Sequence, residues 1–132
     1  MSVTGHIKRY TFSFRERLSR QKDFSRVFTS GRKATHPALC IYVYVNTPPV
    51  KDAVRRLGLV TSRKVGIAAD RNRVKRRLRE IFRTSKFSLA PGCDVVAVPR
   101  KPAVALSFEE LRTVFMALLE RAAVYHKDAG VL

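Results

Sequence analysis

The segment Arg71 to Arg83, RNRVKRRLREIFR, constrains the fold more than any other part of the chain, because it is both basic and helical in period. Its apolar residues recur at helical spacing and form one stripe that needs a core to pack against: Val74, Leu78, Ile81 and Phe82. At about 100° per residue, the side largely opposite this stripe carries Asn72, Lys75, Arg76, Arg79 and Arg83. The sequence therefore predicts an amphipathic helix between Gly66 and Ser85 with a cationic outer face.

That cationic face is more than a solvated surface. Like charges at i,i+3 and i,i+4 spacing lower helix stability, and a face meant only for water more often mixes signs. Over all 132 residues, Lys and Arg number 27 against 10 Asp and Glu, for a formal net charge of +17. Such a charge requires an anionic partner, which charge alone leaves open between nucleic acid, a membrane surface and an acidic protein. Because the arginine fork bonds phosphate oxygens in pairs, we expect nucleic acid.

The rest of the chain predicts one small domain of mixed helices and strands. We expect helices from Gln21 to Ser30, closed by Gly31 as C-terminal cap, and after a capping box at Ser107 and Glu110. Strands are expected at Ala38 to Asn46, at Arg56 to Thr61 and at Asp94 to Pro99, with a weaker one at Arg32 to Thr35. We expect residues 1–17 to form a flexible basic arm, residues 18–126 a single RNA-binding domain and residues 127–132 a tail.

The strand from Ala38 alternates between an aliphatic and an aromatic face. Leu39, Ile41, Val43 and Val45 make the first, and Cys40, Tyr42 and Tyr44 the second. Cys40 and Cys93 form no C-x-x-C pair, so no zinc site or disulfide is expected, and His36 is expected to serve a turn before Pro37. The chain shows no membrane span and no signal-like hydrophobic run, so we expect a cytoplasmic protein that does not bind membranes.

The basic segment and its flanks carry a specific resemblance. The string TSRKVGIAADRNRVKRRLREIFR is similar to the signature of the bacterial ribonuclease P protein family. The similarity extends to DFSRVFTSGR, LCIYVYV, RLGLVTSRK and GCDVVAVPRK, and covers the chain from about Leu18 to Ala122.

This resemblance implies a fold and a function. The fold would be an α/β (α+β) sandwich of order αβββαβα, with a small central sheet, a left-handed βαβ crossover and a likeness to ribosomal proteins. The chain would be the non-catalytic protein subunit of ribonuclease P. It would bind the catalytic RNA subunit one to one, hold the 5′ leader of precursor tRNA and so assist removal of the leader. The protein itself would bind no cofactor, and Mg²⁺ would belong to the RNA subunit.

The resemblance also implies residue roles. The residues that match the RNA-binding motif are Lys64, Arg71, Asn72, Arg73, Lys75, Arg76 and Arg79. For the leader cleft the matching residues are Phe24, Phe28 and Tyr42, although the i,i+4 spacing of the two Phe residues also fits simple core packing. Tyr44, on the same aromatic face of the strand, is a further candidate because its ring could also stack on a base. Asp70 departs from the expected pattern, and either caps the helix or pairs with an arginine.

Three other functions fit part of the sequence. A ribosomal or other RNA-scaffold protein could carry the same basic helix on a small sheet. A DNA-compacting protein would bind duplex DNA and structured RNA equally. A metal-dependent nuclease would need clustered carboxylates, whereas the acidic residues here are scattered along the chain.

Overall fold

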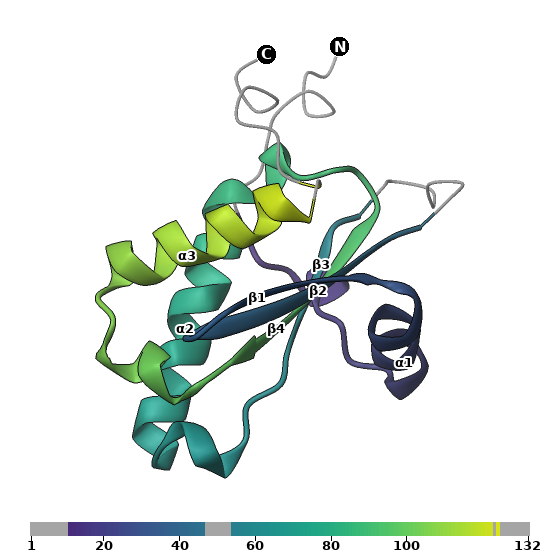
Figure 1. The fold of residues 1–132 in the computed structure, drawn as a ribbon. Coiled ribbons are helices and arrows are strands. Elements are labelled where there is room, and N and C mark those ends of the chain that lie inside the picture. The colour runs from purple at the N-terminus through teal and green to yellow at the C-terminus, as the bar shows by residue number, and fades with distance from the viewer. Residues whose placement is uncertain (1–10, 47–53, 123, 125–132) are drawn as a thin grey trace.

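The computed structural model describes residues 11–46, 54–122 and 124, and its elements follow the predicted order (Figure 1). The helices and strands are α1 (Gln21–Ser30), β1 (Arg32–His36), β2 (Leu39–Val45), β3 (Arg56–Leu59), α2 (Ala68–Ser85), β4 (Cys93–Pro99) and α3 (Phe108–Arg121). The segment before α3 contains a 3₁₀ helix, Lys101–Ala105. Residues 47–53 between β2 and β3, residues 1–10 of the expected arm and the expected tail of residues 127–132 lie outside the described residues.

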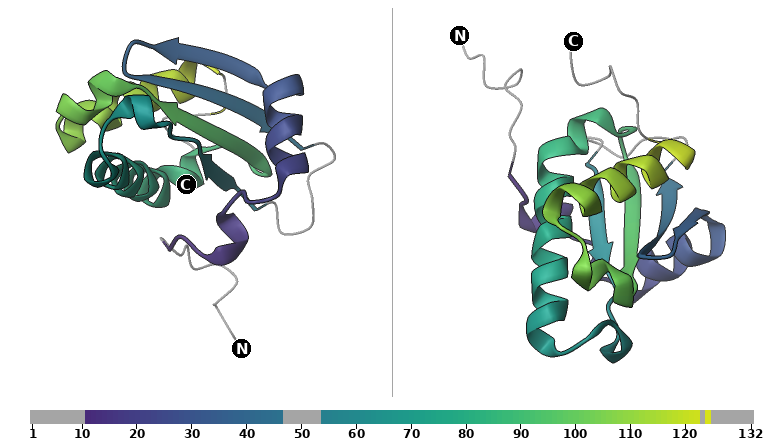
Figure 2. Two further views of the ribbon diagram at one scale, coloured as in Figure 1. Left: turned by 90° about the horizontal axis from the view of Figure 1, so that it is seen from below. Right: turned by 60° about the vertical axis from the view of Figure 1, so that its left-hand side comes forward.

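The strands form one mixed sheet in the order β1-β2-β4-β3. β2 runs antiparallel to β1 and to β4, whereas β3 and β4 are parallel neighbours joined through α2. In the right-hand view of Figure 2 both strands point downward, β4 lies to the right of β3, and the helices lie in front of the sheet. The crossover is therefore left-handed, as the resemblance implies, against the strong general preference for right-handed connections.

The sheet buries both of its faces (Figure 2). The face toward α2 and α3 carries the main core, to which β2 contributes Leu39, Ile41 and Val43. The face toward α1 carries a smaller core of Leu18, Val27 and Val96, flanked by half-buried aromatic residues. The alternation of β2 thus sends its aliphatic side to one layer and its tyrosines to the other, as predicted.

Helix α1 ends at Ser30, as predicted, but Gly31 is not in the left-handed conformation that a C-terminal cap often adopts. Its backbone is extended, with φ −82° and ψ 166°, and its N–H donates to the Val27 carbonyl at 2.9 Å. A Cβ atom at Gly31 would lie 2.8 Å from the Val43 carbonyl oxygen and closer still to that of Val27. Glycine is needed here because α1 and β2 approach closely, and not because of a positive φ.

Residues Thr11 to Ser19 form a segment that we call the strap. Its contacts hold residues 11–17 of the expected flexible arm against the domain, so this part of the arm is not loose. Leu18 N–H donates to the Leu57 carbonyl at 3.0 Å, and the Phe12 ring meets the Phe82 ring edge-on at 5.8 Å. The buried Lys86 ammonium pairs with the Glu16 carboxylate and donates to the Thr11 carbonyl. These partners are far apart in sequence, so a reading by local periodicity could not detect them.

A buried ionic network joins α1 to the middle of the sheet. Asp94 of β4 is fully buried and accepts two hydrogen bonds from the Arg56 guanidinium of β3, each 2.8 Å long. Arg56 also lies 3.3 Å from Asp23 of α1, and Asn46 donates to Asp94 at 3.1 Å. Because a buried charge is tolerated only when it is paired and hydrogen-bonded, these contacts fix the relative positions of α1, β3 and β4.

We expect Asp94→Ala to lower the free energy of unfolding by about 3–5 kcal/mol, because it leaves Arg56 without its main partner in a largely desolvated position. Urea denaturation followed by circular dichroism measures this change. Glu120→Ala, at an exposed position of α3, is the matched control and should change stability by less than about 0.5 kcal/mol. A loss below about 1 kcal/mol for Asp94→Ala would contradict the assigned role.

Candidate nucleic-acid interface

The basic residues of α2 point in three directions, and one set is engaged within the protein. Arg73 donates to the Val104 carbonyl at 3.2 Å, and Arg77 donates to the Leu106 carbonyl at 2.8 Å. Both carbonyls lie in the segment that leads into α3. These two arginines therefore tie α2 to the start of α3, which gives them a structural role that sequence alone did not reveal.

Asp70 takes the second of its two predicted roles. The N-cap of α2 is Ile67, and Asp70 lies in the first turn, so the prediction that Asp70 begins the helix is wrong. Its carboxylate lies 3.6 Å from the Arg73 guanidinium. A carboxylate in the first turn also complements the positive end of the helix dipole. Arg71 turns back locally and donates to the Gly66 carbonyl at 2.7 Å.

A second set forms the outer face of α2, defined here as Asn72 and Arg76 together with Lys64. Asn72 and Arg76 are exposed, and Lys64 is exposed in the preceding 3₁₀ helix, Arg63–Val65. None of the three side chains forms a hydrogen bond or ion pair with another residue in the described part of the chain. Arg83, further along the helix, pairs with Glu80 at 2.6 Å. The side-chain donors of the outer face that lack a partner among the described residues therefore lie in the first three turns of α2 and in the 3₁₀ helix just before it.

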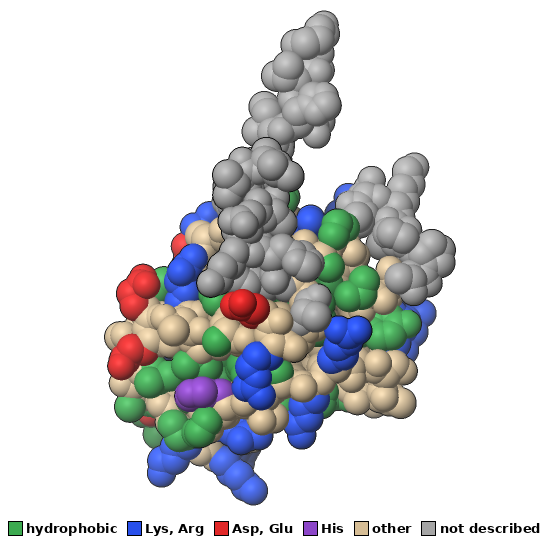
Figure 3. Space-filling view, turned by 45° about the horizontal axis from the view of Figure 1, so that its top comes forward, with side chains coloured by type: hydrophobic (Ala, Val, Ile, Leu, Met, Phe, Trp, Pro, Cys, Tyr) green, Lys and Arg blue, Asp and Glu red, His purple; other side chains and the backbone are tan. Residues whose placement is uncertain are grey.

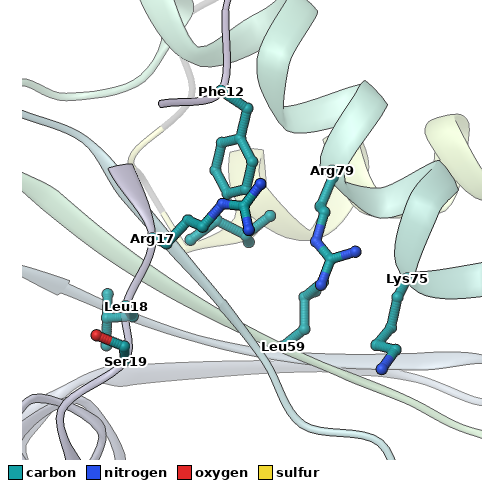
Figure 4. Close-up of a pocket in the computed structure, with 8 residues that line it drawn as sticks. Phe12, Arg17, Leu18, Ser19, Leu59, Lys75 and Arg79 are labelled. Carbon is teal, nitrogen blue, oxygen red and sulfur yellow. The ribbon is translucent and has the colours of Figure 1, made fainter. Parts of the chain in front are cut away.

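The third set points toward the strap and forms the strap pocket. Lys75 and Arg79 line a pocket of about 210 Å³ whose other walls come from the strap and β3. Figure 4 shows Phe12 and Arg17 on one side of this space and Arg79 and Lys75 on the other. The Arg17 guanidinium lies 5.1 Å from the centre of the Phe12 ring. The remaining lining residues are Leu18, Ser19, Leu57 and Leu59.

The aromatic surface, defined as Phe24, Phe28, Tyr42 and Tyr44, lies between α1 and the sheet. The Phe28 and Tyr42 rings meet edge-on with centroids 4.7 Å apart, and Phe28 is 39% exposed. Phe24, Tyr42 and Tyr44 are half-buried against the smaller core. The structure therefore brings the four predicted residues together, with Phe28 more open to solvent than the other three.

Two further residues shape this surface. The Lys33 ammonium of β1 lies 5.4 Å from the centre of the Tyr42 ring, which places a cation beside the aromatic pair. A Cβ atom at Gly58 of β3 would lie 2.6 Å from the Phe24 ring, so glycine makes room for Phe24 against the sheet. Neither residue was predicted, because both contacts depend on how the strands pair.

Charge is distributed unevenly over the described surface. On the face shown in Figure 3, acidic side chains gather toward the left, whereas Lys and Arg side chains lie mainly along the lower part and the right. Helix α3 carries exposed acidic residues at Glu109, Glu110 and Glu120. The same helix also carries the exposed cations Arg112 and Arg121, so its surface mixes charges of both signs.

Metal-ligating residues do not cluster in the described residues: no group of three or more His, Cys, Asp or Glu side chains is placed to hold an ion. His36 accepts a hydrogen bond from the Ala38 N–H at 3.0 Å, which confirms its predicted role in the turn. Cys40 and Cys93 are buried free thiols, and burial raises the pKa of Cys93 to about 12. None of the described helices is long and apolar enough to cross a membrane.

Comparison with known proteins identifies the family. The sequence model of the family described as Ribonuclease P matches residues 12–123, which is most of the chain. The chain belongs to the ribonuclease P protein family. A ribonuclease P protein component from Bacillus pumilus (strain SAFR-032) is 35% identical over 114 residues, which cover 86% of this chain and 93% of that relative. One from Shouchella clausii (strain KSM-K16) is 36% identical over 109 residues, covering 83% and 87% respectively.

Solved ribonuclease P proteins share the fold. The RNase P protein from Thermotoga maritima superposes with a TM-score of 0.68 at 34% identity, covering 80% of this chain and 96% of that one. The Staphylococcus aureus RNase P protein gives a TM-score of 0.72 at 26% identity, covering 84% and 98%. The predicted α+β fold is therefore confirmed for this family member, and its small central sheet is four-stranded and mixed.

The strap of this family member should respond to pH through Glu16. Burial raises the pKa of Glu16, but hydrogen bonds from Lys86 and Ser13 outweigh it, so the pKa lies below its usual 4.5. A carboxyl whose pKa is lowered by folding stabilises the fold above its unfolded pKa, and this stabilisation is lost as pH falls through the folded value. We expect the strap to loosen below about pH 4.5, seen as increased backbone mobility of Phe14 to Arg17 by NMR relaxation.

Glu16→Gln should loosen the strap already at neutral pH, whereas Glu120→Gln should leave its mobility unchanged. A strap that stays rigid in Glu16→Gln at pH 7 would show that the ion pair with Lys86 is not what holds it.

Proposed function

We propose that this chain is the protein subunit of ribonuclease P, which binds the catalytic RNA and the 5′ leader of precursor tRNA and assists removal of the leader. The outer face of α2 carries the proposal: Lys64, Asn72 and Arg76 match the family motif, and their side chains form no hydrogen bond or ion pair with another described residue. Arg73 and Arg77 hold the helix in place from its other side. A rigid helix with free donors suits recognition of RNA phosphates.

The aromatic surface suits the single-stranded leader. Aromatic faces stack on bases with little regard to sequence, and nearby cations neutralise the backbone. The exposed Phe28 and the half-buried Tyr42 supply aromatic rings, and Lys33 supplies a cation beside Tyr42. We assign the leader to this surface because the aromatic surface lies beside α1, on the face of the sheet opposite to the face that α2 covers. One protein would then contact two RNAs at once.

We assign the cleavage itself to the RNA subunit and its Mg²⁺, in a one-to-one complex. The carboxylates nearest to the proposed RNA surfaces are engaged with cations: Asp70 with Arg73, Glu16 with Lys86, and Asp23 with Arg56. What the chain supplies is positive charge. A protein of net charge +17 lowers the repulsion between a polyanionic catalyst and a polyanionic substrate.

The first test adds the purified chain to its cognate catalytic RNA at low Mg²⁺. We expect kcat/KM for a leader-bearing precursor tRNA to rise by about tenfold or more, equivalent to at least about 1.4 kcal/mol of the barrier. A small basic protein of unrelated fold serves as the control for charge alone. No enhancement beyond that control would favour a general RNA-scaffold protein. Cleavage without the RNA subunit would show that the chain is itself a nuclease.

The second test separates the two RNA surfaces. Arg76→Ala should weaken binding to the catalytic RNA and reduce the slope of log K against log salt by about one, since one phosphate contact is lost. Tyr42→Ala should weaken binding of leader-bearing precursor tRNA by about 1–3 kcal/mol through loss of base stacking, and leave leaderless tRNA unchanged. Fluorescence anisotropy over a salt series measures both.

Arg112→Ala, at an exposed position on α3, removes the same charge at a distance and should have little effect on either RNA. If Tyr42→Ala weakened leaderless and leader-bearing tRNA equally, the leader would not bind at the aromatic surface.

A further inference from the structure

We propose that the strap pocket binds a single unstacked nucleotide of the catalytic RNA, with its base against Arg17 and Phe12 and its phosphate on Lys75 and Arg79. This inference rests on the proposed function and adds a site to it. Two of the four residues belong to the strap and two to α2, so the site exists only because the strap is docked.

The pocket is built for an anion. Its charged lining consists of Arg17, Lys75 and Arg79, with no carboxylate among the lining residues. None of the three forms an ion pair with a described residue, and the nearby Glu16 is engaged by Lys86. Three cations that face one small space repel each other, and a bound phosphate would relieve this repulsion with charge-assisted hydrogen bonds.

The pocket is more than a phosphate site. Leu18, Leu57 and Leu59 give it an apolar floor, which an inorganic ion would not need. The Arg17 guanidinium is held 5.1 Å from the centre of the Phe12 ring, and a guanidinium supported in this way can stack on a base. A dry cavity of about 150 Å³ is large enough for benzene, so a pocket of about 210 Å³ has room for an aromatic base.

The position of the pocket favours the catalytic RNA over the leader. Lys75 and Arg79 lie on the same helix as Asn72 and Arg76, each three residues further along, and they line the pocket beside the strap. An RNA strand that lies on the outer face of α2 therefore needs to turn only one nucleotide inward to reach the pocket. The aromatic surface lies on the other side of Leu18 and β3, between α1 and the sheet, and we expect the leader of the precursor tRNA to bind there.

A direct test titrates the full chain, labelled with ¹⁵N, with AMP, adenosine or inorganic phosphate. AMP should shift the amide signals of the strap and of Leu57 to Leu59, and should bind about tenfold more tightly than phosphate or adenosine alone, because it uses both halves of the pocket. Equal affinity for AMP and phosphate would reduce the site to an anion site and overturn the nucleotide assignment. Shifts confined to the aromatic surface would also overturn it.

Variants of the strap link the pocket to RNA. Arg17→Gln should weaken both AMP binding and binding to the catalytic RNA by about tenfold, while Arg112→Ala leaves both unchanged. Phe12→Leu keeps the apolar contact with Phe82 but removes the ring, and should weaken AMP binding with little change in thermal unfolding.

Binding of Arg17→Gln to two RNAs, the catalytic RNA and leader-bearing precursor tRNA, shows which of them supplies the nucleotide. If Arg17→Gln weakens binding of leader-bearing precursor tRNA but not of the catalytic RNA, the leader occupies the pocket and the assignment is wrong. If wild-type protein stimulates cleavage but Arg17→Gln binds every RNA normally, the pocket proposal fails while the proposed function stands. If wild-type protein does not stimulate cleavage, the proposed function itself fails, whatever the result of the AMP titration.

Discussion

The Arg56 guanidinium, placed between the Asp94 and Asp23 carboxylates, is the interaction on which the arrangement of the molecule depends. It joins the edge strand β3 to β4 and to α1 through hydrogen bonds and ion pairs of 2.8–3.3 Å. The aromatic surface and the strap pocket both depend on β3: Gly58 accommodates Phe24 on the α1 face, and Leu57 and Leu59 form the floor of the strap pocket. Arg56 therefore has a structural role, in contrast to an exposed arginine such as Arg76, whose side chain pairs with no other described residue.

The same division of labour runs along α2. Arg73 and Arg77 satisfy backbone carbonyls before α3, whereas Asn72 and Arg76 face outward and Lys75 and Arg79 face the strap. A segment in which nearly every second residue is basic is therefore not one uniform cationic patch. Its net charge sets the attraction for RNA, while the contacts of each side chain decide which of them remain available for phosphate.

Local patterns predicted most of the fold. The helical stripe of α2, the alternation of β2 and the capping box at Ser107 and Glu110 each depend on residues close in sequence, and each was found as predicted. The family resemblance supplied the left-handed crossover, which no local pattern encodes. Three candidate residues of the aromatic surface, Phe24, Phe28 and Tyr42, also came from that resemblance, and the structure brings them together with Tyr44 on one side of the sheet.

What sequence could not supply depends on long-range contacts. The contacts that hold the strap join residues dozens of positions apart, namely Phe12 to Phe82, Glu16 to Lys86 and Leu18 to Leu57, so local periodicity predicts a loose arm up to residue 17. Asp70 pairs with Arg73 and does not cap α2 because the N-cap lies three residues earlier, at Ile67, and helix boundaries are the least reliable part of a sequence-based prediction. The strap pocket was missed for the same reason, because half of its lining comes from the strap.

The strap also covers an edge of the sheet and so limits association of the protein with its own copies. An edge strand offers unpaired backbone groups to any other strand, and a sheet with two open edges risks association with its own copies. The strap closes one edge, since Arg17 bridges to Leu57 and Leu18 donates to the Leu57 carbonyl. The opposite edge, β1, carries Arg32 and Lys33, whose charges repel an incoming copy. One edge is thus covered by the chain itself, and the other is guarded by the charge that also attracts RNA.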